Sequence, residues 1–91
     1  MIQTLISVET SPLFSFVRNK EKKYIPTDRP YFLFNNQTWF FNEEVHEWFV
    51  DLELYYTLSY RQPESPFENP KVYLYTTCTE HLLLFMLTWK I

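Results

Sequence analysis

The chain has 91 residues and no glycine, and this absence restricts both its turns and its chemistry. Glycine-rich phosphate loops and the dinucleotide-binding fingerprint both need backbone that passes close to a phosphate without a side chain in the way. The sequence therefore excludes both kinds of site. Turns with positive φ angles must instead use Asn or Asp, the residues with a side chain that best tolerate the left-handed region.

The length indicates a single domain covering residues 1–91. A domain of this size hides only about 60–65% of the surface that its unfolded chain exposes, so it needs large side chains in its core. Nine Phe, seven Tyr and three Trp supply that bulk. Many of these rings are therefore expected in the core.

The clearest periodic pattern runs from residue 42 to residue 60, where apolar residues recur at three- and four-residue steps. Asn42 is a suitable N-cap, and Glu43 and Glu44 stand in the first turn, where the helix dipole favours negative charge. The pattern predicts one long amphipathic helix over 42–60. The residues of its inner face are Val45, Trp48, Phe49, Leu52, Tyr55 and Tyr56.

Short runs of β-branched and aromatic residues predict strands before and after this helix. The runs are 2–8, 13–17, 31–34, 38–41 and 71–77. Asn35 and Asn36 separate two of them and predict a β-hairpin. Residues 81–91 alternate in a way that favours a strand paired with 71–77, although Thr79 is also a possible cap for a short helix. The predicted fold class is α+β, with a small antiparallel β-sheet of about five to six strands packed against one long amphipathic helix.

The composition indicates where such a protein works. A single cysteine, Cys78, forms no internal disulfide and fits a reducing compartment. The N-terminus lacks the pattern of a secretory signal, and no apolar run approaches the roughly 20 residues of a membrane span. We expect a cytoplasmic protein that makes no membrane contact.

The chain lacks Gly and Ala and is rich in Phe, Tyr and Asn. This composition is typical of GC-poor genes, which are common in phages and other mobile elements. A viral protein would work in the host cytoplasm.

The residue types that carry catalysis or bind metals are sparse. Cys78 and His81 have the spacing of one ligand pair, but structural zinc needs four ligands, and His46 is the only other imidazole. No nucleophile elbow and no glycine-shaped oxyanion hole accompany the cysteine. We predict a non-enzymatic protein with no cofactor and no metal.

Five acidic and no basic residues lie within 42–60. The helical period places four of them on the side away from the apolar face: Glu43, Glu44, Glu47 and Asp51. These carboxylates either keep the outer face of the helix solvated or form a row that binds a basic partner. Carboxylates one turn apart lie about 5–6 Å from each other, close to the separation of successive phosphates in a nucleic-acid strand. Small phage inhibitors of nucleases use that device.

We therefore predict a protein-interaction module, an inhibitor of a host defence or nucleic-acid enzyme that binds a host or complex protein with a basic surface. Trp39 and Phe41 are the rings expected to be exposed as anchors.

Two alternatives remain open. Hairpin rings beside a basic loop resemble the surface of a small single-strand nucleic-acid-binding module, although the net charge of −3 makes nucleic acid a less favoured partner. The basic residues are Arg18, Lys20, Lys22, Lys23 and Arg29. The second alternative is a homodimeric structural subunit, in which a symmetry mate covers the aromatic face of the sheet.

Overall fold

The computed structural model describes residues 1–9, 11–18 and 28–90. These residues form six strands and two helices. In chain order the elements are β1 (Ile2–Ser7), β2 (Phe14–Arg18), β3 (Phe32–Phe34), β4 (Gln37–Phe41), α1 (Glu43–Asp51), β5 (Tyr56–Arg61), β6 (Lys71–Thr76) and α2 (Thr79–Trp89).

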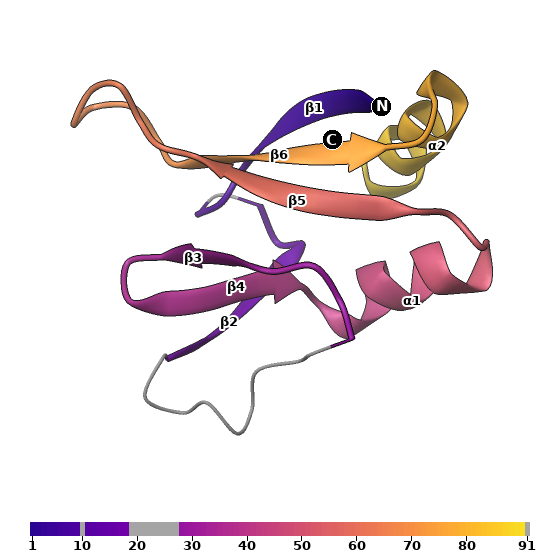
Figure 1. The fold of residues 1–91 in the computed structure, drawn as a ribbon, viewed down its shortest axis with the longest axis horizontal. Helices are drawn as coiled ribbons and strands as arrows, with labels where there is room; N and C mark the ends of the chain where they lie inside the picture. Colours follow the sequence, from indigo (N-terminus) through magenta and orange to yellow (C-terminus); the bar gives the residue numbers. More distant parts are fainter. Residues whose placement is uncertain (10, 19–27, 91) are drawn as a thin grey trace.

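The strands form two antiparallel three-stranded sheets, with the orders β1-β6-β5 and β2-β4-β3. Figure 1 shows the sheets one above the other, with both helices at the same end of the molecule. The α+β class was predicted, but the single sheet and the single long helix were wrong. Rings from the two sheets meet where β3 approaches β5, with the Phe32 and Tyr60 ring centroids 6.0 Å apart. A small chain with many rings can therefore fill a core between two short sheets.

The predicted 42–60 helix ends early, because α1 stops at Asp51 and the chain then enters β5. The N–H of Leu52 donates to the carbonyl of Trp48, and Glu53 turns the chain with a φ of 55°. Beyond this turn the buried residues alternate, with Tyr56 and Leu58 inward on β5. Two adjacent tyrosines fit the end of a helical pattern and the start of a strand equally well, which explains the error.

The predicted C-terminal strand was also wrong, because the chain forms α2 there. The central strand β6 already pairs with β1 on one side and β5 on the other, so it offers no free edge to a further strand. Leu and Met, which make up most of the apolar residues of α2, are also good helix formers.

The β3–β4 hairpin confirms the prediction. Its turn residues Asn35 and Asn36 have φ angles of 53° and 58°, as expected for a type I′ turn. Glu53 and Lys90 also adopt positive φ, which the sequence did not predict. Both follow the end of a helix, where glycine is the usual residue. In a chain without glycine, each costs about 1–2 kcal/mol of backbone strain.

Phe41 occupies the centre of the core and is fully buried. Its ring stacks on Phe14 of β2 with the centroids 4.9 Å apart. It also lies 6.1 Å from Phe49 of α1, 5.5 Å from Tyr56 of β5 and 5.8 Å from Phe85 of α2. One side chain thus joins both sheets and both helices.

Candidate functional site

The four carboxylates predicted to form a row on α1 are all on its outer surface. The buried residues Val45, His46 and Phe49 define the inner face of the helix. The exposed acidic residues are Glu43, Glu44, Glu47 and Asp51. Although α1 is shorter than predicted, its nine residues include the whole row.

The start of α1 is fixed by Asn42. Its side-chain oxygen accepts a hydrogen bond from the N–H of Val45 at 3.2 Å, and its side-chain nitrogen donates to the carbonyl of Pro12 at 3.2 Å. The backbone N–H of Asn42 donates to the carbonyl of Leu13 at 2.9 Å. These bonds tie the helix to the chain preceding β2, so the acidic row is held on a rigid element.

One basic residue does reach the acidic row, although none lies within 42–60. Arg29 contacts Glu43 through Nη1 at 3.4 Å and Asp28 through Nε at 3.3 Å. The hydrogen bond from Arg29 lowers the pKa of Asp28. Among the residues that the structure describes, the other three carboxylates form no ion pair.

Apolar side chains are exposed toward the C-terminal end of this helix. Val50 lies on the outer side of α1, between Glu47 and Asp51 in sequence, and is 56% exposed. Tyr55, just before β5, is also 56% exposed. The sequence prediction missed both, because it placed Tyr55 on the inner face of an overlong helix and gave Val50 no role. Together with Glu43, Glu44, Glu47 and Asp51, they form what we call the α1 surface.

The two rings predicted as exposed anchors are not equivalent. Phe41 is fully buried, so the prediction that it is exposed was wrong. Trp39 is half-buried and lies against Phe16, with the ring centroids 4.7 Å apart. Its indole N–H donates to the carbonyl of Phe34 at 3.3 Å. Trp39 therefore keeps part of its surface accessible on the β2-β4-β3 sheet.

The predicted basic surface is only partly described. Arg18 is exposed at the end of β2, while Arg29 is turned toward Asp28 and Glu43. Lys20, Lys22 and Lys23 lie outside the described residues. Arg29, one of the two described members of the predicted basic surface, thus belongs to the edge of the α1 surface rather than to a separate phosphate-binding surface.

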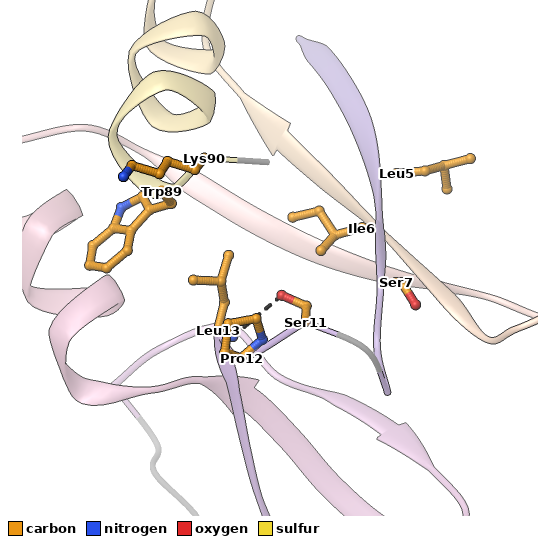
Figure 2. A pocket seen from close by; sticks show the side chains of 8 residues that line it. All are labelled: Leu5, Ile6, Ser7, Ser11, Pro12, Leu13, Trp89 and Lys90. Carbon is orange, nitrogen blue, oxygen red and sulfur yellow. Dashed lines mark hydrogen bonds between the residues drawn. The ribbon is translucent and has the colours of Figure 1, made fainter.

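A cavity of about 310 Å³ lies between β1, residues 11–13 and the end of α2. Figure 2 shows Ile6, Leu13 and Trp89 around it, with Ser11 and Lys90 supplying polar groups. The Ser11 hydroxyl accepts a hydrogen bond from the N–H of Leu13 at 3.3 Å. The cavity is therefore a small, mainly apolar recess with one ammonium group among its lining residues.

Within residues 1–9, 11–18 and 28–90, no group of three His, Cys, Asp or Glu side chains is arranged to hold a metal ion. In the same part of the chain, neither helix has the length and apolar character needed to cross a membrane.

No protein-family model matches the chain, and no curated protein and no solved structure matches it significantly. The function is therefore inferred from the exposed surfaces of the molecule.

Proposed function

We propose that this chain is a non-enzymatic interaction protein that binds a partner with a basic surface through its α1 surface. One observation carries the proposal. Glu44, Glu47 and Asp51 are exposed and have no ion-pair partner in the described part of the chain, while Val50 beside them is 56% exposed. Unpaired carboxylates and an exposed apolar side chain therefore occur together on one short helix.

The two components have different roles. Unpaired carboxylates attract a positively charged surface, raise the rate of association and select the partner by charge. Exposed Val50 and Tyr55 provide apolar area that leaves water on binding, and tyrosine is among the residues that anchor interfaces most often. Together they favour a partner whose basic surface surrounds an apolar patch.

The spacing of the carboxylates supports a more specific partner class. Glu43, Glu47 and Asp51 are one turn apart on α1, which corresponds to about 5–6 Å between neighbours. A surface built to bind successive phosphates presents its cations at a similar spacing. We therefore propose a host nucleic-acid enzyme, including one used in defence, as the partner. The chain would inhibit it by occupying its phosphate-binding surface.

The proposal is tested by capture from nuclease-treated host lysate with the tagged chain. Wild type is compared with Glu47→Lys/Asp51→Lys and with the matched control Glu9→Lys/Glu64→Lys, which makes the same change in net charge at exposed residues outside α1. We expect wild type and the control to retain the same protein at low salt and release it at high salt. The α1 variant should not retain it. Equal capture by all three proteins would contradict the proposal.

Inhibition is tested separately with the captured protein. Wild-type chain should displace a fluorescent oligonucleotide from the purified partner, and the α1 variant should not. A partner that binds the chain and the oligonucleotide simultaneously would overturn the inhibitor assignment while leaving the interaction intact. Direct binding of the oligonucleotide to the chain alone would favour the nucleic-acid-binding alternative.

A further inference from the structure

Strand β1 lies at the edge of its sheet. Within the described part of the chain, the sheet has the order β1-β6-β5, so β6 is the only strand that pairs with β1. Natural edge strands usually carry charged residues, proline or a bulge, which prevent the addition of a further strand. β1 has the sequence IQTLIS, without charge or proline, and its register with β6 has no bulge. Its outer edge is therefore open to an extended peptide.

The hydrogen-bond pattern shows which backbone groups face the open edge. Val8 continues the register of β1 with β6, and its N–H donates to the carbonyl of Pro70 at 3.0 Å. Successive residues of an antiparallel strand alternate in direction, so the backbone groups of Ile6 also point toward β6. Those of Gln3 and Leu5 point away from β6. The N–H and carbonyl groups of these two residues are thus directed toward the open edge.

The recess between β1, residues 11–13 and the end of α2 lies beside the same part of the strand. Its volume is about 310 Å³, and Leu5 and Ile6 are among its lining residues. In Figure 2 the Ile6 side chain points into the recess and the Leu5 side chain points away, so Leu5 borders the recess through its backbone. Leu13 and Trp89 add apolar surface. A peptide paired with β1 can therefore place an apolar side chain in the recess.

The α2 side of the recess carries two hydrogen-bond donors that lack an acceptor within the described chain. Nε1 of Trp89 is buried and has no hydrogen-bond partner there. Lys90 follows it and forms no ion pair with a described residue. Figure 2 shows both nitrogens on the same side of the recess. The described lining includes no Asp or Glu, and the exposed, flexible Lys90 side chain can share an incoming carboxylate with the indole N–H.

We propose that the open edge of β1 and the adjoining recess bind an extended peptide segment with an apolar and an acidic residue two positions apart. Residues at that spacing lie on the same face of a strand, so both side chains point toward the recess. The peptide backbone pairs with Gln3 and Leu5, and the apolar side chain fills the recess. The acidic side chain accepts hydrogen bonds from Trp89 and Lys90. The main-chain bonds provide affinity and the recess provides specificity.

The site uses residues outside the α1 surface and does not depend on the proposed function. It is tested by NMR titration of the isotope-labelled chain with short blocked peptides of Ser and Thr that contain Leu and Glu two positions apart, in both orders. The Trp89 indole N–H resonance should shift. At saturation, amide hydrogen exchange should slow about tenfold or more at Gln3 and Leu5, but not at Ile6, which already pairs with β6. The absence of any shift at about 1 mM of either peptide would overturn the proposal.

Two substitutions separate the backbone and charge contributions. Gln3→Pro removes a donor from the open edge and leaves the β6 ladder intact, because proline is tolerated where the N–H of an edge strand faces solvent. It should weaken binding about tenfold or more. Lys90→Glu should weaken binding of the Glu peptide about tenfold, but not that of the same peptide with Gln in place of Glu.

Arg18→Glu is the matched control, because it makes the same charge change at the exposed end of β2, and it should bind like wild type. Circular dichroism confirms that each variant is folded. Equal binding of the Glu peptide by wild type and all three variants would contradict the proposed site.

A second copy of the chain is the competing occupant of the open edge. Hydrogen exchange of the free chain distinguishes the two. Protection of Gln3 and Leu5 that increases with protein concentration would show that β1 pairs with another copy, and the proposal would be wrong. Peptide binding that slows exchange at neither residue would place the peptide in the recess alone and would exclude strand addition.

Discussion

Replacing Phe41 by alanine should have the largest effect of any single substitution in the core. The Phe41 ring is fully buried and contacts rings from β2, α1, β5 and α2. Truncating such a residue removes its transfer free energy and leaves a cavity, at a cost of about 3–5 kcal/mol. A chain of 91 residues has a total stability of about 5–14 kcal/mol, so Phe41→Ala removes a large part of it.

Urea unfolding followed by tryptophan fluorescence measures this loss directly. A loss of 3–5 kcal/mol corresponds to a fall in Tm of roughly 12–40 °C for a domain of this size. Phe67→Ala is the control, because Phe67 is 94% exposed and its truncation should change the unfolding free energy by less than about 0.5 kcal/mol. A loss below about 1 kcal/mol for Phe41→Ala, with cooperative unfolding retained, would refute the central position of this ring.

Two further predictions concern a turn and a buried hydrogen bond. Asn36→Val should destabilise the chain by about 1–2 kcal/mol in urea unfolding, because a β-branched residue tolerates the positive φ of this turn poorly, whereas Asn36→Gly should not. Tyr56→Phe should cost about 1–3 kcal/mol, since it leaves Nδ1 of buried His46 without the Tyr56 hydroxyl at 2.7 Å. Burial raises the pKa of Tyr56, so the folded state favours the neutral phenol and stability should fall as the pH rises above about 10. Tyr56→Phe should lose this alkaline component; the same pH dependence in both proteins would contradict the assignment.

The parts of the fold that were predictable are those with a local signal. The Asn35–Asn36 turn was predictable because, without glycine, few residues can take two successive positive φ angles. The start of α1 was predictable from the Asn42 cap and the acidic first turn. Both features depend on residues close together in the sequence.

The parts that were not predictable depend on distant contacts. Whether residues 81–91 form a strand or a helix depends on whether β6 has a free edge, and that is decided by its pairing with β1 and β5. The burial of Phe41 likewise results from four elements meeting in space, and the pairing of Arg29 with Glu43 joins residues fourteen apart. Periodicity within one segment contains no information on such contacts.

The most direct test of the proposed function is the salt dependence of binding between the chain and its purified partner, measured by isothermal titration calorimetry. We expect the Kd to rise steeply with salt for wild type and for Glu9→Lys/Glu64→Lys. For Glu47→Lys/Asp51→Lys, the binding should be weaker and its salt dependence flatter, because the screened charges have been removed from the α1 surface. The same Kd and the same salt dependence for all three proteins would show that the acidic row does not bind the partner.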